Sequence, residues 1–184
     1  MQGTRTDRRK RIILLSVSIG ILLLVVFLDQ FTKHYFSSYV KENGTVTVIE
    51  NFFYIAHVVN TGAAWSFLAD VSWGQLLFKI LTPIALIVFG FIYVYAFKKN
   101  YKWMQISIAF IIGGTIGNYI DRLIFGGVTD FISLVFGSYK FPVFNLADTF
   151  LVVGVIMIFI HFLFLDENAI FKKKNAKQDL SDNK

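Results

Sequence analysis

The sequence predicts an all-α membrane protein with four transmembrane helices, a small extracytoplasmic antiparallel sheet and both termini in the cytoplasm. Of its 184 residues, 55% are hydrophobic and only 16% are charged, whereas a soluble domain carries about 25% charged residues. This apolar excess is too large for one buried core, so lipid must act as a second solvent. The basic residues also gather at the ends of the apolar segments.

Four apolar segments are long enough to span a membrane. They are Ile12–Leu28, which can extend as helix to about Phe36, and then Leu76–Phe97, Trp103–Phe125 and Val143–Leu165. Each is near the roughly 20 residues that about 30 Å of hydrocarbon requires. The basic start and first apolar run also resemble a signal peptide, but the run continues into Asp29-Gln30-Phe31-Thr32-Lys33 without a small-residue cleavage site. The first segment is therefore predicted to be an uncleaved span.

The distribution of basic residues predicts the topology. They precede the first span, lie between the second and third, and follow the fourth: Arg5, Arg8, Arg9, Lys10, Arg11, Lys98, Lys99, Lys102, Lys172, Lys173, Lys174 and Lys177. An even number of spans lets all these segments lie in the cytoplasm, as the positive-inside rule requires. Residues 1–11 and 166–184 are then cytoplasmic tails of one membrane domain, residues 12–165. Basic blocks can bind nucleic acid, but beside spans they favour topology and anionic lipid, so no nucleic-acid partner is expected.

The first outer connection predicts the small sheet. Thr45–Ile49 alternates as a strand does, and Phe52–Ile55 and Val58–Val59 are rich in strand-forming residues. We expect an antiparallel sheet over about residues 44–68, lying on the outer ends of the helices.

The sequence contains no cysteine, which excludes disulfides and thiolate catalysis.

Charged residues within or beside the spans indicate where a functional site lies. A charged side chain near the centre of a bilayer costs at least about 2.5–3.5 kcal/mol, so it needs a partner or a function. With the topology above, nearly all of these residues lie toward the outer ends of the spans: Asp29, Lys33, Lys79, Asp121, Arg122, Asp130 and Asp148. A transporter or channel would need polar residues along the whole depth of a span. The clustering therefore favours a site at the outer leaflet.

Some of these charges have a structural interpretation. Asp29 and Lys33 have the i,i+4 spacing of a helical ion pair, although Lys33 could instead extend outward to lipid head groups. Asp121 and Arg122 are expected to tie helix ends to the outer loops through ion pairs and hydrogen bonds. Residues 118–121 and 145–148 share an Asn-x-x-Asp pattern that is too short to indicate a repeat. The third span carries small residues at four-residue spacing, which favours close helix packing: Ala109, Gly113 and Gly117.

Asp130 and Asp148 point to catalysis. Both lie among apolar residues with no basic residue close by in sequence. Two carboxylates brought together in an apolar setting share a proton. One can then activate a water as base while the other protonates the carbonyl oxygen and later the leaving amine, which hydrolyses a peptide without a covalent intermediate. Spacing alone leaves open a pair of Asp121 with Asp148.

Other chemistries have little support in the sequence. His34, His57 and His161 lack the spacing of metal ligands. There is no G-x-S-x-G motif, and the Gly-Gly pairs lack the lysine of a phosphate-binding loop. We therefore expect no metal, nucleotide or other cofactor. A non-enzymatic scaffold would leave two buried acids without obvious partners, which is costly.

Five short motifs follow one another along the chain: Asp29-Gln30-x-Thr32-Lys33, Asn60-Thr61-Gly62-Ala63-Ala64-Trp65, Gly117-Asn118-x-x-Asp121-Arg122, Gly127-Val128-x-Asp130-Phe131 and Phe141-Pro142-x-Phe144-Asn145-x-Ala147-Asp148. In this order, and on these spans and loops, they resemble the lipoprotein signal peptidases (signal peptidase II), a family of intramembrane aspartyl proteases. The resemblance covers about residues 12–165. Thr129 is a departure, because a valine commonly stands before the aspartate in that family.

The resemblance implies a specific function. The family sits in the bacterial cytoplasmic membrane with its site toward the extracytoplasmic side, and its fold is four helices with a small β-cradle. It cuts the signal peptide from diacylglyceryl-modified prolipoproteins just before the lipidated cysteine. Its catalytic aspartates correspond to Asp130 and Asp148, and further matching positions bind substrate or support the site: Asn60, Gly62, Asn118, Asp121, Arg122, Asn145, Asp29 and Lys33. The implied partners are lipid-modified prolipoproteins and membrane lipids, and a monomer without cofactors is expected.

Overall fold

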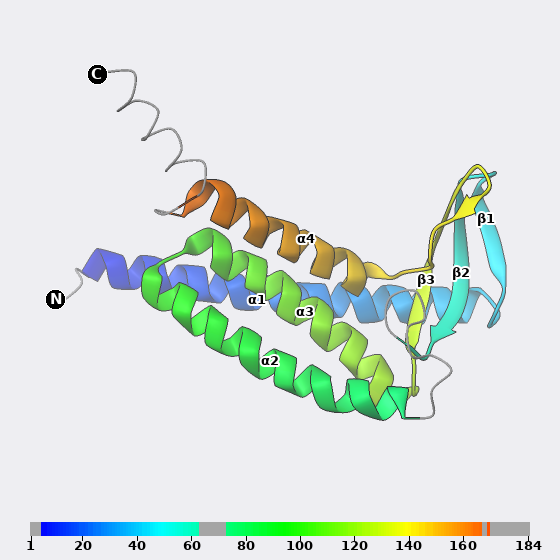
Figure 1. Cartoon of the computed structure of the whole chain (residues 1–184), viewed down its shortest axis with the longest axis horizontal. Coiled ribbons are helices and arrows are strands. Elements are labelled where there is room, and N and C mark those ends of the chain that lie inside the picture. The colour runs from blue at the N-terminus through cyan, green and yellow to red at the C-terminus, as the bar shows by residue number, and fades with distance from the viewer. Residues whose placement is uncertain (1–4, 63–72, 167–168, 170–184) are drawn as a thin grey trace, which may run out of the picture.

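Four long helices form a bundle with a small sheet across one end (Figure 1). The computed structural model describes residues 5–62, 73–166 and 169. The helices are α1 (Arg5–Tyr39), α2 (Gly74–Lys99), α3 (Lys102–Ile124) and α4 (Leu146–Ile160), the last continuing as a π-helix (His161–Leu165). Within the described residues, four helices are long and apolar enough to cross a membrane. The four predicted spans are thus confirmed.

Parts of both predicted tails and of the predicted sheet region lie outside the residues that the structure describes. The described part of α1 includes Arg5–Arg11 of the predicted tail, because arginine and lysine are good helix formers that prolong the helix beyond the apolar span. The polar tail is described only at residues 166 and 169, and residues 63–68 of the predicted sheet region also lie outside the described ranges.

Helix α3 lies at the centre of the bundle and packs against each of the other three helices. Its small residues allow this close approach. A Cβ on Gly113 would come within 2.8 Å of the Val25 side chain on α1, and one on Gly114 would come within 2.5 Å of the Ala147 carbonyl at the start of α4. The small-residue face predicted for the third span is therefore a surface of close contact with other helices. Helices α1, α2 and α4, in contrast, expose most of their large apolar side chains.

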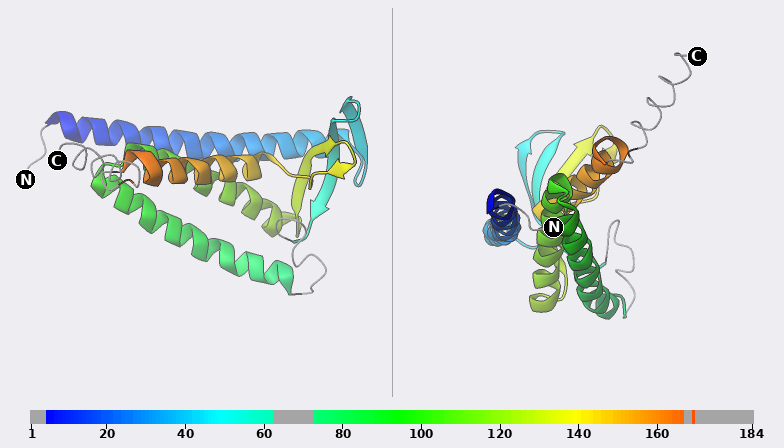
Figure 2. Two further views of the ribbon diagram at one scale, coloured as in Figure 1. Left: turned by 45° about the horizontal axis from the view of Figure 1, so that its top comes forward. Right: turned by 90° about the vertical axis from the view of Figure 1, so that its left-hand side faces the viewer.

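The basic end of the bundle lies opposite the sheet. The start of α1, the connection between α2 and α3, and the end of α4 lie together at one end (Figures 1 and 2). Lys98 and Lys99 form the last turn of α2 at this end. The arrangement fits an even number of spans with the basic segments on one side, while the side of the membrane to which that end belongs stays a prediction.

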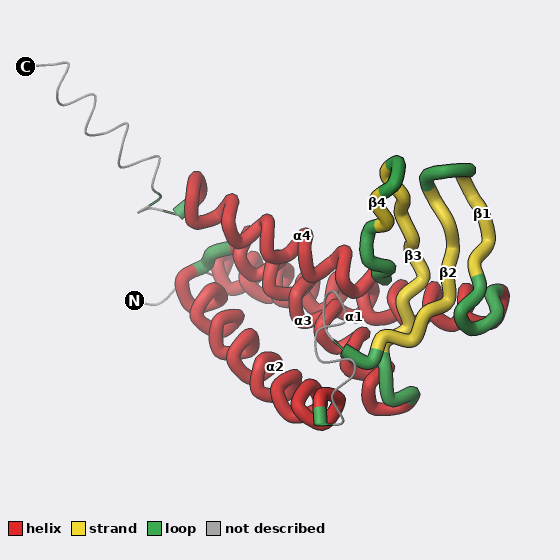
Figure 3. Tube along the Cα trace, turned by 45° about the vertical axis from the view of Figure 1, so that its right-hand side comes forward, coloured by secondary structure: helices red, strands yellow, loops and turns green. Residues whose placement is uncertain are grey.

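The sheet is antiparallel throughout and, within the described residues, has four strands in the order β1-β2-β3-β4 (Figure 3). The strands are β1 (Thr45–Ile49), β2 (Phe53–Asn60), β3 (Val128–Phe136) and β4 (Tyr139–Lys140). The first two confirm the sheet predicted in the first outer connection. The last two come from the second outer connection, for which no strand was predicted.

A bulge in β2 decides which side chains face the helix ends. The register between β2 and β3 shifts between Ile55 and Val58, after which Val58 lies opposite Asp130 and Asn60 opposite Val128. Side chains alternate along a strand, so Asn60 and Asp130 point to the same face of the sheet. The sheet thereby places an amide beside one of the acids that the sequence singled out.

Candidate active site

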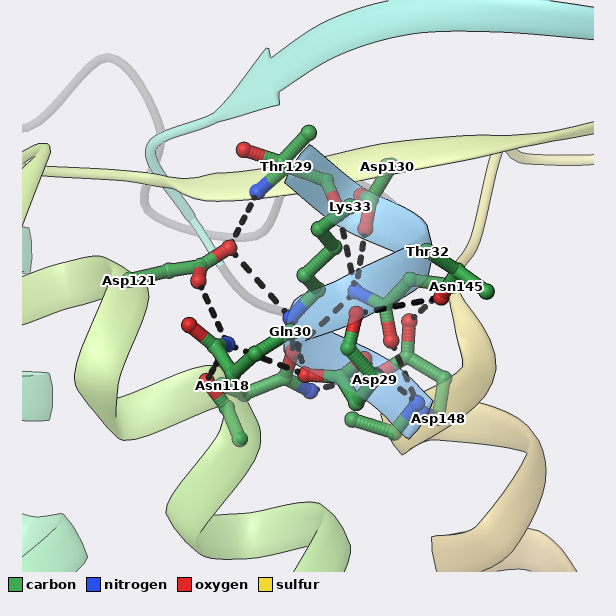
Figure 4. Close-up of polar contacts among 12 residues, drawn as sticks. Asp29, Gln30, Thr32, Lys33, Asn118, Asp121, Thr129, Asp130, Asn145 and Asp148 are labelled. Carbon is green, nitrogen blue, oxygen red and sulfur yellow. Dashed lines mark hydrogen bonds and ion pairs between the residues drawn. The ribbon is translucent and has the colours of Figure 1, made fainter. Parts of the chain in front are cut away.

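Polar side chains from α1, α3, α4 and the sheet meet where the sheet covers the end of the bundle (Figure 4). Most of them are buried: Asp29, Lys33, Asn118, Asp121, Thr129, Asp130 and Asn145. Buried polar groups cost free energy unless they find hydrogen-bond partners. Each of these residues has such a partner within the cluster, through its side chain or its backbone.

Asn145 caps α4 and contacts both acids. Its Oδ1 accepts a hydrogen bond from the backbone N–H of Asp148 at 2.9 Å, and Oδ2 of Asp148 accepts one from the backbone N–H of Asn145 at 3.2 Å. This is a capping box, and it fixes the first turn of the helix. Nδ2 of Asn145 also donates to Oδ1 of Asp130 at 2.7 Å. One asparagine therefore connects the strand and the helix that carry the two acids.

Asp130 is a buried acid with two amide donors. Its Oδ2 accepts from Nδ2 of Asn60 at 3.1 Å, and its Oδ1 accepts from Asn145. Burial raises the pKa of Asp130 to about 7, and the negative charge of Asp148 adds to this; the two amides and the charge of Lys33 act in the opposite direction without cancelling it. Near neutral pH this carboxyl can hold or release a proton.

Asp148 lies on the first turn of α4, and each of its two carboxyl oxygens has a hydrogen-bond donor. Its Oδ1 accepts from Nδ2 of Asn118 at 2.8 Å, and its Oδ2 accepts from the backbone of Asn145. The N-terminus of a helix also favours negative charge. Both oxygens of Asp148 therefore accept hydrogen bonds.

Lys33 forms the predicted ion pair, and it does so inside the protein. Its Nζ lies 2.9 Å from Oδ2 of Asp29 and 3.3 Å from Oδ2 of Asp121. The residue is only 3% exposed, so the alternative in which it extends outward to lipid is wrong. Asp121 also accepts from the backbone N–H of Thr129 at 2.9 Å, which ties the end of α3 to β3 as expected.

Arg122 holds the segment that follows β2. Its Nη2 donates to the carbonyl of Gly62 at 3.1 Å, and its guanidinium lies over the ring of Phe78, 5.2 Å from the centroid. The backbone N–H of Gly62 in turn donates to Oδ1 of Asn60 at 3.0 Å. The predicted tie between the end of α3 and an outer connection is therefore present, and it fixes the amide that contacts Asp130.

Two features of the site were not recognised in the sequence. Gln30 donates to Oδ1 of Asp121 at 2.9 Å and to the carbonyl of Gly117 at 3.0 Å, so it joins α1 to α3. The available signal was its position in the sequence, because Gln30 lies between the charged residues Asp29 and Lys33 within an apolar span. The Asn-x-x-Asp spacing of residues 145–148 was read only as too short for a repeat, although it is also the signature of a helix cap.

The predicted site residues are thus brought together by α1, α3, α4 and two strands of the sheet. Within residues 5–62, 73–166 and 169, no group of three or more His, Cys, Asp or Glu side chains is arranged to hold a metal ion. Four helices able to cross a membrane, with amides and carboxyls buried beneath the sheet at one end of the bundle, define a polytopic membrane protein with a buried polar site.

Comparisons with known proteins place the chain in a family. The family model for signal peptidase (SPase) II matches residues 21–164. The lipoprotein signal peptidase of Enterococcus faecalis is 40% identical over 166 residues, which are 89% of this chain and 97% of the relative. That of Bacillus subtilis is 36% identical over 143 residues, 78% and 90% of the two chains. A bacterial membrane enzyme solved by the in meso method is 38% identical with a TM-score of 0.70, over 82% of this chain and 95% of the other.

The chain belongs to the signal peptidase II family. It is therefore a multi-pass membrane protease, and the expected fold of four spans with a small antiparallel sheet is confirmed.

Proposed function

We propose that the chain is an aspartic endopeptidase that removes the signal peptide from diacylglyceryl-modified bacterial prolipoproteins, cleaving just before the lipidated cysteine. Its family and the name lipoprotein signal peptidase carried by its relatives support the substrate class. The catalytic type rests on a single observation. Asn145 donates to Asp130 through its side chain and to Asp148 through its backbone, in a buried site.

The two aspartates take different roles in this proposal. Asp130, with a pKa raised to about 7, carries the shared proton and acts as the acid. Asp148, which accepts hydrogen bonds on both oxygens, acts as the base. Asp148 takes a proton from water as the water oxygen attacks the scissile carbonyl carbon, and Asp130 protonates the carbonyl oxygen. When the C–N bond breaks, the proton held by Asp148 passes to the leaving amine, in place of the transfer from the acid considered from the sequence. A hydroxyl group of the tetrahedral intermediate returns its proton to Asp130, which restores both aspartates.

Asp121 fits a supporting role better than a catalytic one. Its Oδ2 is paired with the ammonium of Lys33 and accepts from the backbone N–H of Thr129, and its Oδ1 accepts from Gln30, so both oxygens are already engaged within the protein. Of the pairings left open by the sequence, the geometry therefore favours Asp130 with Asp148. Asn118 and Asn145 support that pair, and Asn60 and Gly62, held by Arg122, are assigned to the substrate backbone.

The membrane side of the site follows from the charges. The acidic site lies at the sheet end, and the basic segments lie at the other end. We place the basic end, with both termini, in the cytoplasm and the sheet end outside a bacterial cytoplasmic membrane. Acyl chains on a substrate cysteine would then lie in the leaflet that borders the site. Because one bundle supplies every residue of the site, we assign a monomer.

The test is cleavage by the purified protein in detergent–lipid micelles. The substrate is a prolipoprotein with a diacylglyceryl-modified cysteine, and its matched control is the same precursor without the lipid. We expect cleavage of the modified precursor alone, with the lipidated cysteine as the new N-terminal residue, and an unchanged rate after chelator treatment. Cleavage of both precursors at one rate, or at another bond, would overturn the substrate assignment.

A further inference from the structure

Lys33 is a group whose hydrogen-bonding role cannot reverse. Its ammonium contacts three acceptors: Oδ2 of Asp29 at 2.9 Å, Oδ1 of Asn118 at 2.9 Å and Oδ2 of Asp121 at 3.3 Å. An ammonium has three donors and no acceptor, which is one N–H group for each of these contacts. An amide can turn over and a carboxyl can take up a proton, but a charged lysine can only donate. It therefore sets the polarity of the hydrogen bonds around it.

The orientation that Lys33 imposes extends, through the side-chain amides of Asn118 and Asn145, to both aspartates. Because Oδ1 of Asn118 faces Lys33, its Nδ2 faces Oδ1 of Asp148 at 2.8 Å. Oδ1 of Asn118 also accepts from Nδ2 of Asn145 at 3.0 Å, and the same amide nitrogen donates to Oδ1 of Asp130 at 2.7 Å. Turning the Asn118 amide over would set its NH2 group against the ammonium. Each aspartate therefore receives an amide donor whose orientation traces back to Lys33.

The carboxylates paired with Lys33 also hold the backbone next to each aspartate. Oδ1 of Asp29 accepts from the N–H of Ala147 at 2.9 Å, one residue before Asp148. Oδ2 of Asp121 accepts from the N–H of Thr129 at 2.9 Å, one residue before Asp130. One ammonium thus joins the two carboxylates that fix α4 and β3 at the points where the aspartates leave them (Figure 4).

We propose that Lys33 is a positioning residue for peptide hydrolysis, which fixes the amide donors and the backbone that orient Asp130 and Asp148. This rests on the proposed function, in which those two aspartates are catalytic. Without the ammonium, the Asn118 amide can reverse, and its oxygen can then accept a hydrogen bond from a protonated Asp148. The shared proton is then no longer confined to Asp130, and the division between acid and base is lost.

The positive charge of Lys33 also affects the pKa of Asp130. Lys33 interacts with Asp29 on α1, Asp121 on α3 and Asp130 on β3. The other charged groups of the cluster, Arg122 on α3 and Asp148 on α4, interact with Asp130. The positive charge of Lys33 opposes the rise in the pKa of Asp130. Its removal should therefore raise that pKa further, which a purely structural ion pair remote from the chemistry would not do.

The experiment compares variants that separate positioning from folding. Lys33→Met removes the ammonium, but it leaves two buried carboxylates without a cation, which is destabilising. Asp29→Asn and the double variant Asp29→Asn/Lys33→Met form a second comparison in which the charge of the pair is balanced, and an asparagine oxygen can still accept from Ala147. Lys41→Met is the matched control, because Lys41 is an exposed lysine in the first outer connection.

We expect kcat to fall about 100-fold in Lys33→Met, and by a similar factor in the double variant relative to Asp29→Asn, as for a misplaced catalytic group. KM should change little, the alkaline limb of the pH profile for Lys33→Met should move to higher pH, and Lys41→Met should match the wild type. A double variant with the kcat and pH profile of Asp29→Asn would overturn the proposal. So would a loss confined to KM or to the melting temperature.

The same assay distinguishes this inference from the proposed function. Asp130→Asn is measured alongside the lysine variants. If it is inactive while the lysine variants cleave normally, the positioning role alone is refuted. If Asp130→Asn itself cleaves at the wild-type rate, the aspartate pair is refuted, and the positioning role falls with it.

Discussion

Gly117 offers a sharp test of how closely the helices pack around the site. A Cβ at this position would overlap Oδ2 of Asp29, and it would lie 3.0 Å from Cγ of Asp29 and 3.4 Å from Cβ of Ala147. Oδ2 of Asp29 is the oxygen that pairs with Lys33. Gly117→Ala should therefore displace a buried carboxylate from its lysine, a change that a lipid-facing glycine-to-alanine substitution would not cause.

The expected change in the free energy of unfolding of Gly117→Ala is the balance of one stabilising and two destabilising effects. Alanine is favoured over glycine inside a helix by about 1 kcal/mol. Overpacking costs about 1–3 kcal/mol, and losing one partner of a buried ion pair costs about 3–5 kcal/mol. Because the carboxylate shifts but is not removed, we expect a net loss of roughly 2–5 kcal/mol in the free energy of unfolding. Cleavage activity should fall with it, since the same carboxylate holds the backbone before Asp148.

Gly20→Ala is the control for this measurement. Gly20 also lies inside a helix, on α1, but a Cβ there would meet nothing within 4 Å. It should stabilise the protein by about 0.5–1 kcal/mol and leave cleavage unchanged. Thermal unfolding in detergent and cleavage of a lipid-modified precursor are measured on both variants. A Gly117→Ala protein with the melting temperature and activity of the wild type would refute the reasoning.

Other consequences concern Asp130 and its neighbours. The folded pKa of Asp130, about 7, exceeds its usual 3.8, so between these values the native state binds more protons than the unfolded chain. The free energy of unfolding should therefore decline as pH rises from about 4 to 7, and Asp130→Asn should flatten that slope in melts at stepped pH; an unchanged slope would contradict the assignment. Asn60→Ala removes the amide that donates to Oδ2 of Asp130 at 3.1 Å. Its loss should raise the pKa of Asp130 and move the alkaline limb of the pH–activity profile to higher pH. Arg122→Met removes the hydrogen bond to Gly62, and thermal melts should show a loss of about 1.5–3 kcal/mol; a smaller loss would mean that the bond contributes little.

The spans and the first two strands were predictable because their signals are local. Span length, flanking charge and strand alternation can all be read within about 20 consecutive residues. Strand β3 was missed although Val128–Phe136 is rich in strand formers, because it pairs with β2, which precedes it by two helices. Its aspartate also weakens the strand signal, since aspartate is depleted in strands.

The site was predictable as a set of residues but not as a network. Charge inside apolar spans identified Asp29, Lys33 and Asp121, and the spacing of the first two predicted their ion pair. The contact between Asp29 and the backbone of Ala147 joins residues 118 positions apart, and no spacing rule reports such a contact. The interior position of Lys33 was equally hidden, because lysine reaches lipid head groups from many span ends. Only the packing of α1 on α3 turns it inward.

The most direct test of the central claim is the rate at which Asp130→Asn and Asp148→Asn proteins cleave a diacylglyceryl-modified precursor. Each substitution keeps the shape of the side chain but removes its ability to exchange a proton as an acid or base. Both variants should insert, fold and melt as cooperatively as the wild type, and neither should cleave the precursor. Wild-type cleavage by either folded variant would contradict the central claim.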